Sequence, residues 1–441
     1  MLKTEVTLEK IVNLAKRRGF VFPGSEIYGG LANTWDYGPQ GVELKNNIKN
    51  FWWQRFVRSR FDIVGLDSGI LMNAKVWEAS GHIESFTDPL IECKVCHERF
   101  RADKEDFKEH AHREWTEPQN FQMMFKTFMG PVEEKASTVY LRPETAQGMF
   151  VNYKNVLDTE TMKVPFGIAQ IGKSFRNEIT AGSFIFRVLE FEIAELEYFV
   201  KPGEDDRIFD EWLEEQMAFL LDLGLKKENL RLYEHPKNSL AHYSKRTVDI
   251  EYKFPFGWEE LTGLANRTDY DLKRHMQYSG KDLTYRDPAS GEVYVPFVIE
   301  PTFGIERLML AVMCDAYTEI EGGRTTTTDS TKEVEMMMKF KYHLAPYKVA
   351  VLPLSKKDEL VRVSREVFNK LSKHFATSHH TSQSIGRRYR REDEIGTPFC
   401  VTVDFETLND QAVTIRDRDT MTQERVAIDE VVEVIKEKLQ N

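Results

Sequence analysis

The chain has 441 residues, of which 41% are hydrophobic and 30% charged, and its formal net charge is −11 at pH 7. Such a composition is ordinary for a globular protein of about two to four domains. No apolar run approaches the roughly 20 residues that a membrane-spanning helix needs, and the N-terminus lacks the apolar core of a signal peptide. Four cysteines in so long a chain exclude a disulfide framework, so we expect a cytoplasmic protein in a reducing compartment.

The negative charge argues against bulk, non-specific binding of nucleic acid, but the charge is unevenly spread. Residues 345–441 contain 16 basic and 16 acidic residues, so the acidic surplus lies in residues 1–344. A protein of this kind can still bind RNA when its basic side chains cluster on one surface.

The first 320 residues predict a mixture of helices and antiparallel strands. Apolar residues at helical spacing predict helices at residues 8–18, 46–58, 205–223 and 305–314. Short apolar runs between polar turns predict antiparallel strands within residues 139–199, and further strands at residues 248–254 and 293–299. A polar segment at about residues 91–117, which carries cysteines and histidines, predicts a small inserted module.

The last hundred residues predict a separate α/β domain. The polar stretch at residues 321–329 contains two glycines and is a plausible linker. After it, strands and helices alternate: strands are expected at residues 348–352, 399–405 and 412–415, and helices at residues 359–375 and from residue 429. The predicted fold is therefore α+β, with an antiparallel catalytic domain over residues 1–340 and an α/β domain over residues 341–441.

Arginines beside aromatic and acidic residues are the strongest chemical signal. The sequence contains neither a Walker-type phosphate loop nor a dinucleotide fingerprint, so a bound nucleotide would need another means of holding its phosphates. A guanidinium group stays charged and can donate two parallel hydrogen bonds to phosphate oxygens. Arg176, Arg187 and Arg307 each lie near a glutamate and aromatic residues and are candidates for this role.

All three arginines stand in motifs of a known family. The sequence Phe-Arg-Asn-Glu at residues 175–178, followed by Arg-Val-Leu-Glu-Phe at residues 187–191, resembles motif 2 of class II aminoacyl-tRNA synthetases. Gly-Ile-Glu-Arg-Leu at residues 304–308 resembles their motif 3. Flanking segments are similar to the homodimeric family of glycyl-tRNA synthetases, and they lie at residues 35–39, 77–82, 141–148 and 250–258. The resemblance covers nearly the whole chain.

The resemblance implies that the chain forms glycyl-adenylate from glycine and ATP, releases pyrophosphate, and transfers glycine to the 3′ end of tRNA(Gly). Arg176 is then expected on the α-phosphate and Glu178 on the adenine amino group. Phe191 is expected under the base, with Arg307 above it, while Arg187 bends the triphosphate and Glu260 holds Mg²⁺. Asn177, Phe186, Leu261, Gly304, Ile305 and Glu306 complete the implied ATP site. Arg176, Arg307 and Glu260 are the implied catalytic residues.

A pocket for glycine has no side chain to hold, so it depends on charge and on exclusion of larger substrates. By resemblance, the carboxylates expected around the ammonium group are Glu144, Glu192, Glu195 and Glu300, with Arg101 nearby and Thr302 in the wall. Thr302 departs from the serine that the family carries there, so its extra methyl group would narrow the pocket or change its rotamer.

Two further features depart from the family. Motif 1, which builds the dimer interface in this class, normally ends its strand with a proline, and residues 65–71 contain none. Relatives that bind zinc in the insert carry two Cys-x-x-Cys pairs, whereas this chain has one, Cys93 and Cys96, followed by His110 and His112. These four residues could complete a tetrahedral zinc site or form a metal-free loop.

The C-terminal domain resembles the family's anticodon-binding domain. A cluster of arginines there is expected to contact tRNA phosphates; it comprises Arg387, Arg388, Arg390 and Arg391. A solvated charged turn is the alternative. Other class II synthetases, such as those for threonine or proline, and a synthetase-like binding protein without catalysis are the alternative functions, and the intact motif arginines disfavour the latter.

Overall fold

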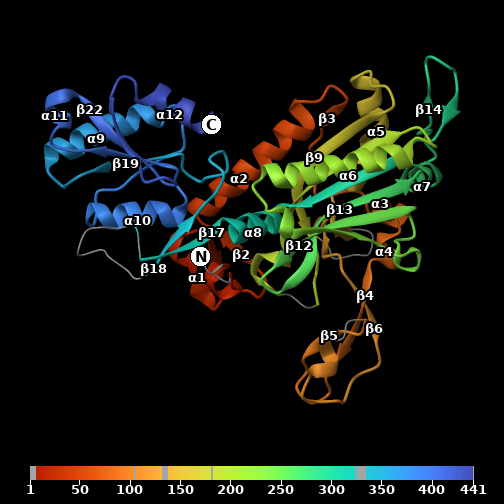
Figure 1. Ribbon diagram of the computed structural model, residues 1–441. Coiled ribbons are helices and arrows are strands. Elements are labelled where there is room, and N and C mark those ends of the chain that lie inside the picture. Colours follow the sequence, from red (N-terminus) through yellow and green to blue (C-terminus); the bar gives the residue numbers. More distant parts are fainter. Residues whose placement is uncertain are drawn as a thin grey trace.

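The computed structural model describes residues 6–103, 106–131, 138–179, 182–322, 324 and 334–440. Figure 1 shows a large body built around one sheet, a smaller α/β domain beside it, and an insert that projects away from the body. Most of the linker expected at residues 321–329 lies outside the described residues. Within the described part of the chain, no helix is both long and apolar enough to cross a membrane.

The N-terminal segment forms a short helix, a hairpin and one long helix. Helix α1 (Leu8–Arg18) has Thr7 as its N-cap and ends at Gly19, as the sequence predicts. Strands β1 (Val21–Pro23) and β2 (Trp35–Tyr37) pair antiparallel. Helix α2 (Pro39–Trp53) continues into a π-helical turn, η2 (Gln54–Arg58), and starts earlier than predicted because Pro39 occupies the first helical turn, where a proline costs no hydrogen bond.

A seven-stranded sheet forms the centre of the body, in the order β11-β12-β13-β16-β10-β9-β3. Its strands are β3 (Ile63–Gly65), β9 (Phe166–Phe175), β10 (Glu190–Val200), β11 (Leu230–Glu234), β12 (Arg246–Phe254), β13 (Gly257–Thr268) and β16 (Phe297–Gly304). All neighbours pair antiparallel except β3, which runs parallel to β9 at one edge. The expected antiparallel α+β architecture is confirmed.

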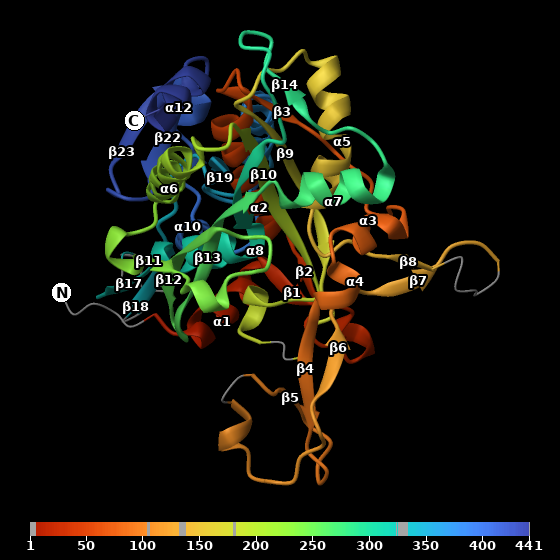
Figure 2. The ribbon, with the colours of Figure 1, turned by 90° about the vertical axis from the view of Figure 1, so that its right-hand side faces the viewer.

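Helices cover both faces of this sheet (Figures 1 and 2). On one face, α2 packs with α6 (Asp205–Asp222) and α8 (Ile305–Ala316) in the largest apolar core of the described residues. On the other face, α5 (Ala146–Thr159) and α7 (Tyr270–Ser279) pack on β9 and β10 around Phe166 and Phe199. The hairpin β14 (Tyr285–Arg286) and β15 (Val293–Tyr294) extends from this side.

Short elements lead from the body into the projecting insert (Figure 2). Helices α3 (Ala74–Ala79) and α4 (His82–Ser85) precede a three-stranded sheet of β4 (Thr87–Glu92), β5 (Arg99–Arg101) and β6 (Gln119–Gln122). A second hairpin follows, formed by β7 (Lys126–Phe128) and β8 (Thr138–Tyr140).

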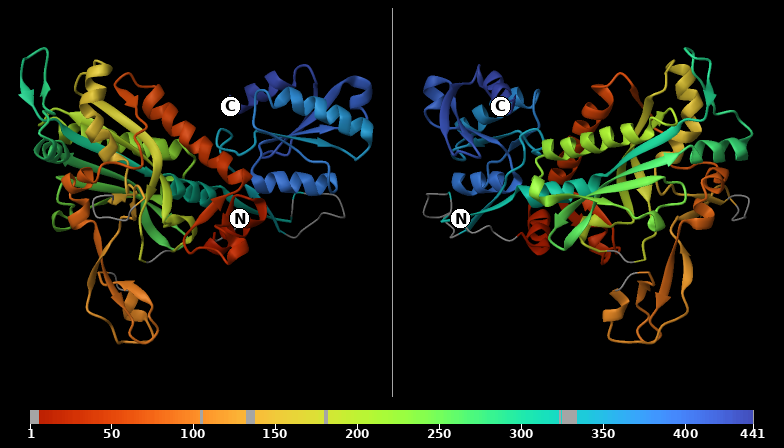
Figure 3. Two further views of the ribbon diagram at one scale, coloured as in Figure 1. Left: turned by 180° about the vertical axis from the view of Figure 1, so that it is seen from behind. Right: turned by 45° about the vertical axis from the view of Figure 1, so that its right-hand side comes forward.

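The C-terminal domain is a five-stranded mixed sheet in the order β20-β19-β21-β22-β23 (Figure 3). Its elements are β19 (Val349–Pro353), α9 (Asp358–Leu371), β20 (Thr377–His379), α10 (Ile385–Ile395), β21 (Phe399–Val403), α11 (Thr407–Asp410), β22 (Ala412–Asp417), β23 (Gln423–Ala427) and α12 (Val431–Gln440). Helices α9 and α12 pack on one face of the sheet, and residues of α10 pack on the other.

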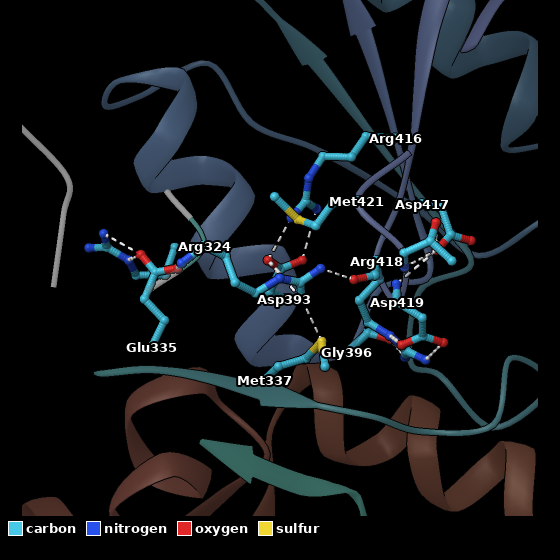
Figure 4. A network of polar contacts seen from close by, with 12 residues as sticks. Arg324, Glu335, Met337, Asp393, Gly396, Arg416, Asp417, Arg418, Asp419 and Met421 are labelled. Atoms are coloured by element: carbon cyan, nitrogen blue, oxygen red, sulfur yellow. Dashed lines mark hydrogen bonds and ion pairs between the residues drawn. The ribbon is translucent and has the colours of Figure 1, made fainter. Parts of the chain in front are cut away.

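Buried ion pairs join this domain to the hairpin β17 (Tyr317–Glu321) and β18 (Val334–Met338), as Figure 4 shows. Asp393 on α10 accepts hydrogen bonds from both terminal nitrogens of Arg416, at 2.9 and 2.8 Å, and lies 3.8 Å from a nitrogen of Arg324. Glu335 on β18 accepts a hydrogen bond from Arg390 at 2.9 Å. Because the partners are buried, separating the domain from β18 would leave charges unpaired away from water.

Candidate active site

The central sheet forms the floor of a cavity of about 640 Å³. The motif residues come together here because four segments meet at this part of the sheet. They are the C-terminal end of β9, the N-terminal ends of β10 and β13, and the start of α8. The cavity is lined by Arg176, Glu178, Phe186, Arg187, Phe191, Glu260, Leu261, Thr302, Gly304, Glu306 and Arg307, with Ile185, Val188 and Ile193. Asn177 and Ile305 of the predicted set lie next to lining residues in the chain but are not among them.

Two arginines in this cavity are held against aromatic rings. The Arg176 guanidinium lies 5.5 Å from the ring centre of Phe86 and 5.4 Å from that of Phe191, and its Nε donates to the Pro143 carbonyl. The Arg307 guanidinium lies 4.4 Å from the ring centre of Phe186. Cation–π contacts of this kind help to orient each guanidinium before a ligand arrives.

The acidic residues of this cavity lie beside those cations. A terminal nitrogen of Arg307 lies 2.9 Å from a carboxylate oxygen of Glu260, and Arg307 is the main cause that lowers the pKa of Glu260. Burial raises the pKa of Glu178, while Arg187 and Arg176 oppose this shift. The arrangement offers both cations for phosphate oxygens and carboxylates for a metal ion or an amino group.

Arg101, expected near the glycine pocket, lies on β5 of the insert and lines neither active-site cavity. It forms ion pairs with Asp88 at 2.7 Å and with Asp103 at 2.8 Å. Its charge also acts on Glu178. The structure therefore places Arg101 in the insert, and its expected role near glycine stays a prediction.

A second cavity, of about 800 Å³, adjoins the first and is rich in carboxylates. Glu144, Glu195 and Glu300, which the sequence analysis expected around an ammonium group, line it together with Arg267. Glu195 accepts hydrogen bonds from the backbone N–H groups of Thr145 at 2.7 Å and Ala146 at 3.0 Å, at the start of α5. The cavity therefore presents negative charge to any cation that enters.

Arg267 is the buried cation at the centre of this acidic group, and sequence analysis did not single it out. Its terminal nitrogen donates to Glu300 at 2.8 Å, and its other nitrogens donate to Asp271 at 2.8 and 2.9 Å. The guanidinium also lies 4.1 Å from the ring centre of Tyr243. Arg267 lies two residues after Ala265 on β13, so both side chains point to the same side of the sheet. This two-residue period was the sequence signal that could have drawn attention to Arg267.

The prediction that Glu192 lies in the glycine pocket is wrong. Its carboxylate lies on the opposite face of β10, where it forms ion pairs with Lys45 at 2.7 Å and Lys49 at 2.8 Å on α2. The reason is the two-residue period of a strand, which separates Glu192 from Glu195. Glu306 belongs to the same buried group, since it accepts a hydrogen bond from Lys45 at 2.6 Å and one from the Glu192 backbone at 2.9 Å.

Asp249 is a further acidic residue that the sequence analysis missed. It lines the second cavity, accepts a hydrogen bond from His235 across 2.7 Å, and has its pKa raised to about 6 by burial and by Glu260. A Cβ atom built on Gly263 would lie 3.6 Å from Asp249 and 3.8 Å from Glu260, so the two carboxylates converge over this glycine. Their convergence forms a candidate site for a divalent cation that prefers oxygen ligands.

The insert brings together the four residues expected to bind metal. One ligand atom from each of Cys93, Cys96, His110 and His112 lies within 4.8 Å of all the others. The Cys96 sulfur and the His110 Nε2 are 3.2 Å apart, and the other nitrogen of His110 lies 3.5 Å from Glu98. Nδ1 of His112 is buried without a hydrogen-bond partner.

The four arginines of α10 do not form one exposed cluster, which corrects the sequence prediction. Arg388 is 2% exposed and donates to the carbonyls of Pro353 and His380, and Arg390 is bound to Glu335. Arg387 is exposed and Arg391 is half-buried. The helical period turns Arg388 toward the sheet, so Arg387 and Arg391 are left as candidates for contact with RNA.

Comparison with known proteins agrees with this arrangement. Residues 125–316 match the family described as "tRNA synthetase class II core domain (G, H, P, S and T)", and residues 348–438 match the family described as "Anticodon binding domain". The chain is 54% identical to the glycine–tRNA ligase of Caldanaerobacter subterraneus subsp. tengcongensis, over 99% of this chain and 100% of that protein.

Similar values hold for two other relatives. Identity is 52% to the glycine–tRNA ligase of Clostridium acetobutylicum, over 99% of this chain and 100% of that protein, and 53% to that of Nocardia farcinica, over 96% and 95%. With nearly the whole length matched at such identity, and with the motif residues gathered around two adjoining cavities, the chain belongs to the glycine–tRNA ligase family of class II aminoacyl-tRNA synthetases.

Proposed function

We propose that the chain activates glycine with ATP, binds ATP and glycine in the two adjoining cavities, and then transfers glycine to tRNA(Gly). The observation that carries this proposal is the boundary between the cavities, because Arg176, Glu260 and Thr302 line both. A carboxylate bound in the acidic cavity and an α-phosphate bound in the other would meet at Arg176. Their approach there is what formation of an acyl adenylate requires.

In this proposal Arg176 stabilises the charge that develops on the α-phosphate as the glycine carboxylate attacks it. The adenine ring rests on Phe191, and its amino group donates to Glu178. Arg307 and Arg187 hold the outer phosphates, and Glu260 with Asp249 holds Mg²⁺, which neutralises phosphate charge when it is bound. No protein nucleophile takes part, so catalysis consists of positioning and charge stabilisation.

Glycine recognition in this proposal uses only the ammonium and carboxylate groups of the substrate. Glu144, Glu195 and Glu300 receive the ammonium group, and Arg176 faces the carboxylate. Thr302 pairs with Glu195 across the strands and lines both cavities, so it stands where a substrate side chain would project. A wall of fixed protein atoms rejects a larger amino acid by steric clash, which an open pocket cannot do.

Replacing Arg176 tests the chemical proposal. We expect Arg176→Ala to lower glycine-dependent ATP–pyrophosphate exchange by about 10²–10³-fold, since one donor to the developing charge is lost. Folding should persist, because this guanidinium lies against Phe86 and Phe191 rather than in a buried ion pair. Arg231→Ala is the matched control, because Arg231 lies on the edge strand β11 and pairs with Glu251. Exchange at the unmodified rate in Arg176→Ala would contradict the assigned role.

We also propose that the insert binds one Zn²⁺ ion through Cys93, Cys96, His110 and His112. Two thiolates and two imidazoles are a common tetrahedral ligand set, whose ligand atoms lie about 3.4–3.8 Å apart around zinc. In the insert the four ligand atoms lie within 4.8 Å of one another, and one pair is 3.2 Å apart, so small shifts would bring them to this spacing. The Glu98 carboxylate lies 3.5 Å from Nδ1 of His110, the ring nitrogen that does not face Cys96. A carboxylate often occupies this position behind a metal-bound histidine.

Metal analysis of the purified full-length protein tests this site. We expect about one zinc per chain, and we expect the Cys96→Ser variant to lose most of it because a thiolate ligand is removed. Cys400→Ala is the control, since Cys400 is buried in β21 of the other domain and should not affect metal content. A value well below one zinc per chain in the unmodified protein would refute the proposal.

For tRNA, we propose that Arg387 and Arg391 on α10 contact phosphates. Arg387→Glu should raise the KM for tRNA(Gly) in aminoacylation and leave ATP–pyrophosphate exchange unchanged, because exchange does not need tRNA. The effect should weaken as salt increases. Lys436→Glu is a control of similar charge change on α12, which packs on the opposite face of the domain's sheet. An unchanged KM for tRNA in Arg387→Glu would exclude this contact.

Dimer formation is a further part of the proposal, and an exposed apolar side chain beside the edge strand β3 supports it. Phe61, in the turn before β3, is 98% exposed. Phe61→Asp should shift the molecular mass measured by light scattering toward that of a monomer, since a buried charge opposes association. Tyr233→Asp, on β11 at the other edge, is the control. A monomeric mass for the unmodified protein would contradict dimerisation.

A further inference from the structure

The floor of the acidic cavity contains a buried carboxyl group that the reaction described above does not use. Glu197 lies on β10, two residues beyond Glu195 and on the same face of the sheet. Strand β10 pairs with β16 in one register, with Glu195 opposite Thr302 and Tyr198 opposite Ile299. This register sets Glu197 opposite Glu300, so the two acids are cross-strand neighbours.

Three carboxylates around this pair are well supplied with hydrogen-bond donors. Asp271 accepts two hydrogen bonds from Arg267 and one from Gln147. Glu144 accepts one from Gln147 at 3.1 Å and lies 3.3 Å from the ring of His82. Glu195 accepts from two backbone N–H groups at the start of α5, where the helix dipole also favours an anion. These three carboxylates therefore have the donors that Glu197 lacks, although burial and the nearby charge of Glu144 raise the pKa of Glu195.

Glu197 and Glu300 lack such support. Both carboxyl oxygens of Glu197 are buried without a hydrogen-bond partner, and the residue is 0% exposed. Glu300 lines the cavity, is 7% exposed, and accepts one hydrogen bond, from Arg267 at 2.8 Å. Burying an ionised carboxylate without hydrogen-bond donors costs far more free energy than burying the neutral acid. Protons would therefore be held by Glu197 and Glu300.

The charge balance of the site also favours protonated carboxyl groups. Five carboxyl groups surround a single guanidinium, so complete ionisation would leave four uncompensated negative charges in a site screened from water. The titratable and charged groups that face the pair are Glu195 on β10, Arg267 on β13, Asp271 and His275 on α7, Glu144 before α5, His82 on α4, and Arg176, His242 and Tyr243 at the mouth.

The pKa shifts agree with the hydrogen bonding. Burial raises the pKa of Glu300 to about 8, although Arg267 opposes this, and burial raises the pKa of Glu197 well above its usual range. Burial lowers the pKa of His275 and of His242, so both rings stay neutral at pH 7 and above. Near neutral pH the empty cavity therefore holds a proton on each member of the Glu197–Glu300 pair.

We propose that the Glu197–Glu300 pair holds two protons in the empty cavity and one when glycine is bound, so that glycine binding releases a proton. This inference rests on the proposed function, because it assumes that the ammonium group binds in this cavity. The O–H bond of Glu300 breaks, its proton passes to solvent, and the Glu300 carboxylate meets the ammonium group. Glu197 keeps its proton and can donate it in a hydrogen bond to that carboxylate, as a positioning residue behind Glu300.

The pH dependence of glycine binding tests the proposal. Below about pH 8 a proton competes with the ammonium group, so the KM for glycine in ATP–pyrophosphate exchange should rise about tenfold for each unit that the pH falls, and should level off above pH 8. Glycine keeps its ammonium group throughout pH 6–8, and the KM for ATP should not follow the same curve. Calorimetric titration of the full-length protein with glycine at pH 7 should give a heat that changes with the ionisation enthalpy of the buffer, equivalent to release of about one proton.

His82 is the main rival source of such a pH dependence, since its ring lies 3.3 Å from Glu144 in the same acidic group. The His82→Gln variant should therefore keep the slope of the glycine KM with pH. A slope that disappears in this variant would assign the proton to His82 and overturn the proposal.

The role of Glu197 is tested by a pair of variants. Glu197→Leu removes the donor behind Glu300 and should move the midpoint of the glycine KM profile to higher pH by about one unit, which raises KM about tenfold at pH 7 with the effect on KM rather than on kcat. Glu197→Gln keeps the size and an N–H donor, so it should restore a profile close to that of the unmodified protein. An unshifted profile in Glu197→Leu would overturn the role of Glu197.

Failure of this inference can be separated from failure of the proposed function. A glycine KM that is flat from pH 6 to pH 8, with a binding heat independent of buffer, would overturn proton release while exchange with glycine still supports the activity. Absence of glycine-dependent exchange at every pH would instead overturn both.

Discussion

The two-residue period of β10 is the constraint on which the site depends. Its pairing with β9 runs without interruption from Glu190 opposite Phe175 to Phe199 opposite Phe166, so no bulge shifts one residue to the other face. Phe191, Glu195 and Glu197 consequently face the cavities. Glu192 and its even-numbered neighbours face the helices α2, α6 and α8. One strand thus supplies the proposed base-stacking ring, a glycine ligand and the floor of the pocket.

The opposite face of β10 fixes the start of α8. Lys45 on α2 is buried and lies between Glu192 and Glu306. Burial opposes the ionisation of Glu192, but Lys45 and Lys49 outweigh it and lower the pKa of Glu192 to about 2. Because that pKa is depressed, the stabilisation is present above the ordinary glutamate range and is lost as the pH falls toward 2. Glu306 stands beside Arg307, so this buried group orients the arginine that faces the nucleotide cavity.

Much of this arrangement could be predicted from sequence because strand residues and motif spacing are local properties. The motif arginines, Glu178 and Glu260 line one cavity, and the ligand atoms of the two cysteines and two histidines of the insert lie within 4.8 Å of one another. Glu192, Arg388 and Arg390 were misassigned because a motif names residues without the direction of each side chain. Glu192 and Glu195 lie three residues apart on β10, so their side chains point to opposite faces of the sheet. The helical period of α10 turns Arg388 toward the sheet of its domain. Arg267 and Asp249 were not assigned, since Glu300 beside Arg267 and Glu260 beside Asp249 meet them only in the folded sheet.

The acidic cavity follows from the smallness of its proposed substrate. Glycine offers an ammonium group, a carboxylate and no side chain, so selective binding must combine concentrated charge with exclusion of bulk. Concentrating carboxylates in a site screened from water is costly, and one guanidinium, Arg267, cannot balance five of them. Protons are the remaining counter-charge that fits such a space. A proton held at Glu300 also leaves when a cation arrives, which keeps the empty cavity stable without blocking the substrate.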